Sequence, residues 1–283
     1  MPTHSRNLPP QDSGTTTYHL YSQHPKVYNY VSPTGALHCL SLPSVGAGPG
    51  LTTVSHLPEP APLQLVVKTE NGDRQVLQPT GLAIIDTSDF DPRLPPAIVC
   101  PRSSAALQRV VDCLSPLIPG TVCSALPGHT PSEKPSQLQQ AMQDRIMEGL
   151  TTLSAGAYAD GARQLRGVGP GLTPAGDDIL SGFLWALSAG DRQWEEARRT
   201  LYEHSIGDNP ISNHILQAAW QGHFFEHVKA VVVRIVERLS AAGTDNEDSA
   251  LRSSCQKLLE HGATSGADTL AGLLHGWQHM MRR

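Results

Sequence analysis

The sequence predicts an α+β protein whose β-rich first half, a small barrel or sandwich, is followed by a mainly α-helical second half. Up to about residue 130 the chain is rich in proline and glycine, and its β-branched residues come in short runs. Beyond that point apolar residues recur every three or four positions, the period of a helix that buries one face. The turn signal in "ENGDR", between two of the short runs, predicts a β-hairpin over Glu70–Arg74.

Three regions follow from this change in composition along the chain. Residues 1–24 are polar and proline-rich and lack the apolar core of a secretory signal, so we expect a disordered arm there. Residues 25–130 form the expected β-rich domain and residues 131–283 the expected helical domain. The polar, proline-containing loop "LPGHTPSEKPS" lies where the helical signals begin.

Each element is expected from its own pattern. Strands are expected at "KVYNYV", "GALHCLSL", "LTTVSHL", "LQLVVKT", "GLAIIDT" and "PAIVC". A helix is expected over 105–117, and another over 137–155, where leucine, isoleucine and methionine side chains fall at helical spacing. Further helices are expected at about 174–189, 192–204, 211–221, 224–240, 248–261 and 265–281.

Composition and charge narrow the class of protein. The chain has 283 residues, 39% hydrophobic and 17% charged, which is ordinary for a soluble globular protein. A net charge of −5 and the absence of a basic run argue against a nucleic-acid-binding surface. Five cysteines without C-x-x-C spacing favour reduced thiols, and no apolar stretch is long enough for a bilayer. We therefore expect a cytoplasmic protein that binds neither nucleic acid nor membrane.

A glycine-rich heptapeptide occurs twice, as "GAGPGLT" at residues 46–52 and as "GVGPGLT" at residues 167–173. In the second copy Thr173 is expected to cap a helix and Pro174 to occupy its first position. A glycine loop before a helix start is a candidate anion site, because free N–H groups and the helix dipole both favour negative charge. The candidate anion-binding residues are Gly48, Gly50, Gly167, Gly169, Gly171 and Thr173, with positive charge from Arg166. The alternative is that the glycines only form tight turns.

An acidic doublet, Asp177 and Asp178, opens the apolar helix that follows the second loop. Because burying an unpaired carboxylate is costly, these side chains need hydrogen bonds, a cationic or amide ligand, or Mg²⁺. "AGDDILSG" at residues 175–182 aligns with "SGADTLAG" at residues 265–272, which pairs Asp178 with Asp268 and leaves open an internal duplication. We expect one site between the two helix starts, with Asp177, Asp178 and Asp268 catalytic and with Gly176, Thr264, Ser265 and Gly266 contacting the ligand.

"HFFEH" at residues 223–227 fits the H-x-x-E-H spacing of one class of zinc peptidases, in which two histidines one helical turn apart bind metal. Glu237 and Glu260 are the candidates for a further ligand, and Gly222 indicates a helix boundary just before the motif. A chance match is the alternative, and we assign no metal-binding residues. His275 and His279 are expected to be solvated or packed.

The motifs "GVGPGLTPAGDDILSGFLWAL" and "HGATSGADTLAGLLHGW", together with the earlier "GAGPG", resemble those of the AllH family over most of the chain, from about residue 25. That family includes one subunit of bacterial oxamate carbamoyltransferase. The resemblance implies a role in anaerobic allantoin and purine breakdown, in which oxalurate and phosphate become oxamate and carbamoyl phosphate with the help of other subunits.

The residues are compatible with this chemistry. Oxalurate and carbamoyl phosphate are small anions, and preorganised N–H groups stabilise the oxyanion formed during carbamoyl transfer. The aspartates can accept hydrogen bonds from the carbamoyl amide, and no activated nucleophile is evident, so direct transfer is expected. No cofactor is firmly implied, although Mg²⁺ is compatible with the aspartates. The alternatives are a non-catalytic anion-binding or scaffold subunit and a zinc hydrolase using His223 and His227.

Overall fold

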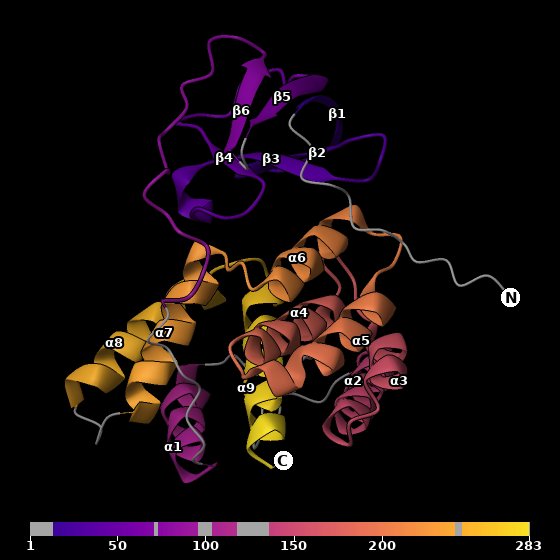
Figure 1. The fold of residues 1–283 in the computed structure, drawn as a ribbon, viewed down its shortest axis with the longest axis vertical. Coiled ribbons are helices and arrows are strands. Elements are labelled where there is room, and N and C mark those ends of the chain that lie inside the picture. Colours follow the sequence, from indigo (N-terminus) through magenta and orange to yellow (C-terminus); the bar gives the residue numbers. More distant parts are fainter. Residues whose placement is uncertain (1–13, 71–72, 96–103, 118–135, 241–244, 283) are drawn as a thin grey trace, which may run out of the picture. The chain divides into compact units, whose positions relative to one another are not determined.

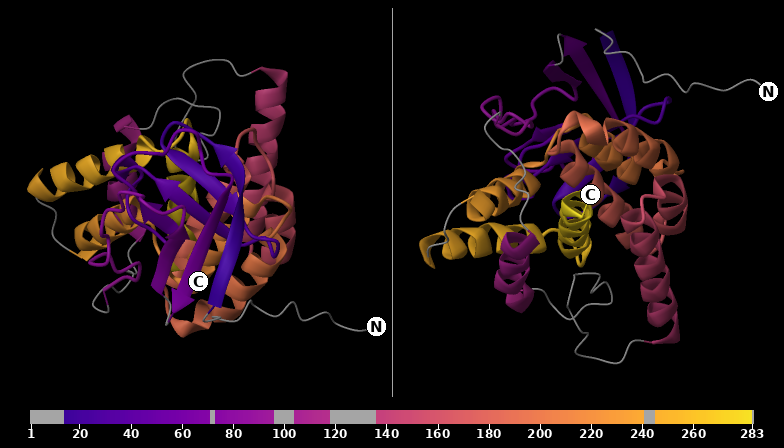
Figure 2. Two further views of the ribbon diagram at one scale, coloured as in Figure 1. Left: turned by 90° about the horizontal axis from the view of Figure 1, so that it is seen from above. Right: turned by 60° about the horizontal axis from the view of Figure 1, so that its bottom comes forward.

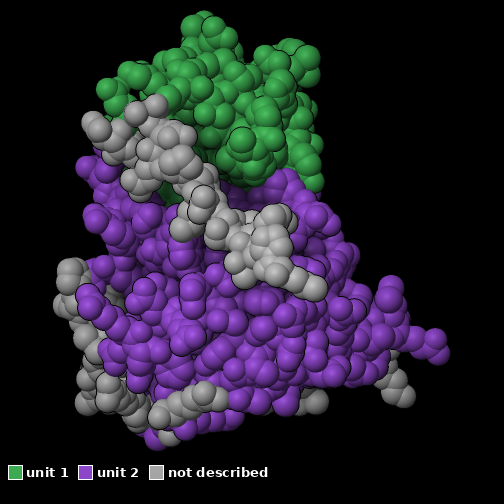
Figure 3. Space-filling view, turned by 45° about the vertical axis from the view of Figure 1, so that its right-hand side comes forward, with its two compact units in different colours: residues 1–87 green, residues 88–283 purple. Residues whose placement is uncertain are grey.

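The computed structural model describes residues 14–70, 73–95, 104–117, 136–240 and 245–282. The chain forms two compact units, Met1–Thr87 and Ser88–Arg283 (Figure 3). The first unit is a β-sheet and the second is helical, so the predicted α+β class is confirmed. The division falls after Thr87 instead of near residue 130, because the helix expected over 105–117 packs with the other helices.

Unit 1 is built on one six-stranded sheet with the order β4-β3-β2-β1-β5-β6 (Figures 1 and 2). Its strands are β1 (Gly14–Gln23), β2 (Val27–Val31), β3 (Leu37–Ser41), β4 (Leu51–Thr53), β5 (Gln64–Glu70) and β6 (Asp73–Gln78). The β5–β6 pair is antiparallel and places Glu70 opposite Asp73, which confirms the predicted hairpin. The β3–β4 pair is parallel although only residues 42–50 connect the two strands.

This sheet is curled so far that its two edges nearly meet. Beyond β6, Ile84 bridges Val54 at the end of β4, and the Ser55 N–H donates to the Ala83 carbonyl. Of the two predicted architectures, the structure has the barrel-like one, with one nearly closed sheet instead of two layers. Its apolar core contains Tyr18, Tyr28, Tyr30, Leu40, Val54, Leu65 and Val67.

Two expectations for this region need correction. Residues 14–23 form β1 and pair with both β2 and β5, so the disordered-arm prediction is wrong for this stretch. Its threonines are β-branched and its side chains alternate in exposure, which suits a half-buried strand despite the polar composition. "GLAIIDT" forms only the bridge at Ile84, and "PAIVC" lies outside the described residues, as do residues 1–13.

Unit 2 consists of helices, and none among the described residues is long and apolar enough to cross a membrane. They are α1 (Ser104–Leu114), α2 (Gln137–Ser154), α3 (Tyr158–Leu165), α4 (Ala175–Ser188), α5 (Glu195–Ser205), α6 (Pro210–Gln221), α7 (Glu226–Ser240), α8 (Asp245–Leu259) and α9 (Ser265–Met281). Each expected helix is present within a few residues. Helix α3 was not predicted, because its eight residues are too few to establish a period.

Helices α4 and α9 pack directly against each other at the centre of unit 2, where Phe183, Trp185 and Trp277 are fully buried (Figure 1). Their close approach depends on glycine. A Cβ at Gly182 would overlap the Thr269 carbonyl oxygen, and one at Gly272 would overlap the Ile179 carbonyl oxygen. The aligned motifs therefore make reciprocal contacts.

Candidate functional site

The second glycine loop, residues 167–173, connects α3 to α4. Gly167, Gly169 and Gly171 have φ values of 70°, 122° and 101°, which other residues rarely adopt. Gly169 also lies so close to the helix start that an added Cβ would be 2.7 Å from the Ala175 nitrogen. The Gly176 N–H donates to the Val168 carbonyl at 2.8 Å and closes the loop onto α4. The glycines are thus required by the backbone path.

The Asp177 side chain forms a hydrogen bond with the first residue of this loop. This side chain is buried, and Oδ1 accepts a hydrogen bond of 2.8 Å from the Gly167 N–H. A loop N–H group thus provides the hydrogen bond that one carboxylate of the acidic doublet needs. Such a bond is one of the three possibilities expected from the sequence. Asp177 therefore holds the loop's first residue.

The segment before α6 holds the other end of the loop. Asn209 Nδ2 donates to the Leu172 carbonyl at 2.6 Å, while its Oδ1 caps α6 by accepting from the Ile211 and Ser212 N–H groups. The exposed Arg166 directs Nη1 to the Ile206 carbonyl at 2.9 Å. Asn209 was not among the predicted site residues, because Asn before Pro predicts a helix cap but not a bond to a loop 37 residues away.

Four N–H groups of the braced loop form no hydrogen bond with any described residue. They belong to Gly169, Gly171, Leu172 and Thr173. Gly171 and Leu172 are exposed, and Gly169 and Thr173 are half-buried. A loop that is held at both ends and points unused donors outward is suited to bind an anion.

Thr173 connects the two sequence motifs. Its Oγ1 lies 2.9 Å from Ser265 Oγ, a hydrogen bond between residues 92 positions apart. The predicted capping role is wrong, because α4 begins one residue later with Pro174 at the cap and with no side-chain cap bond. Thr264, the residue before α9, likewise makes no side-chain cap bond. The structure thus brings together residues 173 and 265, as the single-site expectation required.

Asp178 and Asp268 lie beneath this hydroxyl pair, and both are almost completely buried. Burial raises the pKa of the Asp178 carboxyl well above its usual value, and the negative charges of Asp268 and Asp177 raise it further. Hydrogen bonds from Ser265 and Thr173 lower this pKa but do not reverse the effect. Within the part of the chain that the structure describes, Asp178 Oδ2 has no hydrogen-bond partner.

The candidate glycines inside the helices are packing positions. A Cβ at Gly176 would overlap the Leu165 carbonyl oxygen, and one at Gly266 would overlap the Leu258 carbonyl oxygen. Each glycine lets the end of the preceding helix approach the start of α4 or α9. Their absent side chains therefore serve helix packing, and neither glycine opens onto a surface.

The first glycine loop, residues 46–52, lies in unit 1 and joins β3 to β4. Gly46 and Gly50 have φ values of 81° and 71°. The Gly48 and Gly50 carbonyls accept from Leu51 and Cys39, while the N–H groups of Gly48 and Gly50 form no hydrogen bond with a described residue. Binding of an anion by Gly48 and Gly50 stays a prediction.

The H-x-x-E-H motif does not form the geometry of a zinc peptidase. His223 follows the left-handed cap Gly222 and α7 starts at Glu226, so His223 and His227 do not share a helix. Glu237 pairs with Arg234 at 2.8 Å. No group of three or more His, Cys, Asp or Glu side chains in the described ranges is arranged to hold a metal ion. The zinc interpretation is therefore wrong in its structural premise.

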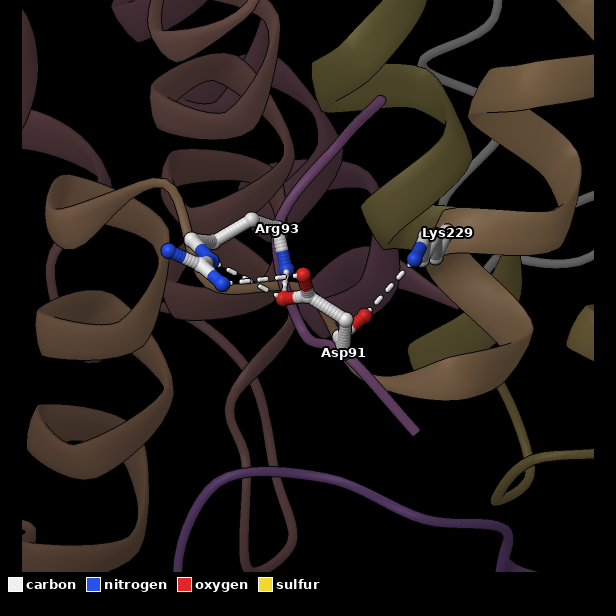
Figure 4. Close-up of polar contacts among 3 residues, drawn as sticks. All are labelled: Asp91, Arg93 and Lys229. Atoms are coloured by element: carbon white, nitrogen blue, oxygen red, sulfur yellow. Dashed lines mark hydrogen bonds and ion pairs between the residues drawn. The ribbon is translucent and has the colours of Figure 1, made fainter. Parts of the chain in front are cut away.

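The residues around His223 instead anchor the segment that follows the unit boundary. The Phe224 N–H donates to the Pro92 carbonyl at 2.7 Å, and Lys229 Nζ donates to the Asp91 carbonyl at 2.6 Å (Figure 4). Hydrogen bonds from the Arg93 side chain and backbone lower the pKa of Asp91 to about 2. This part of the motif has a structural role.

Comparison with known proteins identifies the segment that carries the loop and both helix starts. A family model described as oxamate carbamoyltransferase subunit AllH matches residues 165–277. The resemblance to the AllH family is confirmed over this segment. The AllH segment begins at the last residue of α3 and ends within α9, so it contains residues 167–178 and 261–268. No curated protein and no solved structure matches the chain.

Proposed function

We propose that this chain is a subunit of an oxamate carbamoyltransferase-like enzyme and that its small anionic substrate binds on the loop at residues 167–173. The enzyme would transfer a carbamoyl group between oxalurate and phosphate during allantoin catabolism in the cytoplasm, together with other subunits. The description of the matching family as a subunit of such an enzyme supports the complex and the reaction class.

The proposal rests on the backbone N–H groups of the loop at residues 167–173, which are held in fixed positions. Asp177 and Asn209 hold its two ends by bonds of 2.8 and 2.6 Å, while the N–H groups of Gly169, Gly171 and Leu172 have no hydrogen-bond partner among the described residues. Donors fixed in advance of the reaction stabilise developing negative charge without the cost of reorganisation. A loop built only as a turn would not need bracing at both ends.

The reaction needs little from the protein beyond these donors. A phosphate oxygen bonds to the carbamoyl carbon while the bond from that carbon to the oxamate nitrogen breaks, and the nitrogen takes up the proton that phosphate releases. The loop N–H groups bind the phosphate or the oxyanion at the carbamoyl carbon. Thr173 and Ser265 connect the loop to the acidic pair, because both hydroxyls hydrogen-bond to the Asp178 carboxyl. Asp268 acts on the same carboxyl through its negative charge.

The test is phosphate-dependent cleavage of oxalurate by the chain reconstituted with its partner subunits. Gly171→Ala is the informative variant, because φ at this residue is +101° but no atom lies within 4 Å of an added Cβ. The substitution therefore changes the loop path without a clash, and we expect a loss of about tenfold or more in kcat/KM. Gly81→Ala is the matched control, with φ +83° and equally open surroundings in unit 1.

A scaffold subunit would behave differently. Carbamoyl phosphate and oxalurate would then not raise the melting temperature of the chain, and Gly171→Ala would leave the reconstituted activity equal to that of Gly81→Ala. Either result would refute the proposed site.

A further inference from the structure

Arg166 directly precedes the loop at residues 167–173, and the segment between α5 and α6 holds its side chain. Arg166 Nη1 donates to the Ile206 carbonyl at 2.9 Å. An added Cβ on Gly207 would lie 3.3 Å from Arg166 Cδ and 3.6 Å from its Cγ, so the aliphatic part of the arginine runs along the Gly207 backbone. One hydrogen bond and one packing contact therefore position this exposed guanidinium group.

Gly207 is fixed in turn by one side chain of α6. Asn213 Oδ1 accepts from the Gly207 N–H at 3.0 Å, and Asn213 Nδ2 donates to the Gly207 carbonyl at 2.8 Å. The φ value of Gly207 is outside the left-handed region, so the backbone path does not explain a glycine here. Its missing side chain instead leaves the space that the Arg166 stem occupies.

Arg166 forms no ion pair with a residue that the structure describes. The arginines that do form ion pairs in the described ranges are Arg93, Arg163, Arg234 and Arg238. A guanidinium group has five N–H donors, and the Ile206 carbonyl takes one of those of Arg166. The remaining donors form a planar fork whose geometry matches the two oxygens of a carboxylate.

The segment that holds Arg166 also holds the other end of the loop, because Asn209 Nδ2 donates to the Leu172 carbonyl at 2.6 Å. Ile206 and Asn209 are three residues apart, so their Cα atoms are at most about 11 Å from each other. The guanidinium group and the end of the loop that carries the Gly171 and Leu172 N–H groups therefore meet the same short segment. This arrangement suits a small molecule with an anionic group at each end.

We propose that Arg166 binds the carboxylate of the carbamoyl donor, while the loop N–H groups bind phosphate or the oxyanion at the carbamoyl carbon. The inference rests on the proposed function and extends it, because it restricts the site to donors that carry a carboxylate. Oxalurate fits, since its carboxylate and its carbamoyl group are at opposite ends. Gly207 and Asn213 are positioning residues that act through Arg166.

The experiment is isothermal titration calorimetry of the full chain with three separate ligands. Oxamate is the half of oxalurate that carries the carboxylate, methyl oxamate is its uncharged ester, and inorganic phosphate is the ligand of the loop. The wild type should bind oxamate saturably and methyl oxamate about tenfold more weakly or less tightly still. Arg166→Gln should weaken oxamate binding about tenfold or more and phosphate binding much less.

Two variants separate the fork from the charge and from the fold. Arg166→Lys keeps the charge without the planar fork and should restore only part of the oxamate affinity. Gly207→Ala should weaken oxamate binding by displacing the arginine stem, but should have no further effect in the Arg166→Gln background, which a merely structural role would not produce. Arg163→Gln is the matched control, since Arg163 is an exposed arginine paired with Asp160 on α3, and it should bind all three ligands like the wild type.

Equal affinities of the wild type for oxamate and methyl oxamate, or equal losses of oxamate and phosphate binding in Arg166→Gln, would overturn the inference. In the reconstituted enzyme, Arg166→Gln should raise the KM for oxalurate more than the KM for phosphate. If Gly171→Ala impairs oxalurate cleavage but Arg166→Gln does not, only the carboxylate assignment fails. If the wild type cleaves no oxalurate, the proposed function fails, and oxamate binding by the full chain still decides the role of Arg166.

Discussion

Substitution of Gly182 by alanine tests how closely α4 and α9 must approach. An added Cβ would overlap the Thr269 carbonyl oxygen and lie 2.8 Å from the Leu273 nitrogen and 3.0 Å from the Gly272 Cα. All three obstacles are backbone atoms, so no rotamer change relieves the contact and the helices must separate. The separation loosens the packing around Phe183 and Trp277, which are fully buried.

The expected change in the free energy of unfolding is the difference between a stabilising and a destabilising effect. Alanine is favoured over glycine inside a helix by about 1 kcal/mol, which stabilises the variant. Forcing extra volume into a packed core costs about 1–3 kcal/mol and more where the backbone must move, so we take about 4 kcal/mol. The net loss in free energy of unfolding is therefore about 3 kcal/mol, measured by urea unfolding of unit 2 in the full chain.

Gly149→Ala on α2 separates the steric effect from the change in helix propensity. It brings the same helical gain, but the nearest atoms to its Cβ belong to the Leu165 side chain, which can rotate. We expect a smaller loss there, and for Gly272→Ala a loss like that of Gly182→Ala, because its obstacles are the backbone of Ile179 and Phe183. A Gly182→Ala variant as stable as the wild type, or more stable than Gly149→Ala, would refute the reasoning.

Two further predictions concern buried polar groups. The pKa of Asp178 is raised in the folded state above its unfolded value of about 3.9, so its contribution to stability is fully present below pH 4 and is lost as pH rises through the folded pKa. In metal-free buffer the melting temperature of the wild type should therefore fall from pH 4 to pH 8 when it is compared with that of Asp178→Asn. Both proteins contain Asp177 and Asp268, so the difference reports Asp178. A rise in the wild type relative to the variant would contradict the expected sign. Tyr158→Phe removes the hydroxyl 2.7 Å from Nε2 of the buried His279, whose Nδ1 lies 3.0 Å from the Ser154 carbonyl, and should cost about 1–3 kcal/mol in urea unfolding. Tyr202→Phe is the control, since this tyrosine stacks on Trp220, and an equal loss there would argue against the His279 bond.

Local chemistry explains what could be predicted from the sequence. The helical period located α2 and α4 to α9 within a few residues, and Asn-Gly between β-branched runs located the β5–β6 hairpin, because both signals act between near neighbours. The alternation in β1 was equally local but was hidden by its polar composition. The motifs at residues 167–178 and 261–268 were recognisable as one family's pattern, and the family comparison confirmed it.

Only the tertiary structure decided what each residue of the motifs does. Asp177 and Asp178 are adjacent in the sequence, yet one accepts the Gly167 N–H and the other faces Ser265 and Asp268. Thr173 looked like a helix cap but bonds to Ser265, and Asn209 holds the loop from another helix start. His223 and His227 had metal-binding spacing but no common helix. The sequence by itself determined most of the helices, the β5–β6 hairpin and the candidate loop, because propensity and periodicity are local. The site's pairings join residues 37 and 92 positions apart, and such contacts exist only once α4 has packed against α6 and α9.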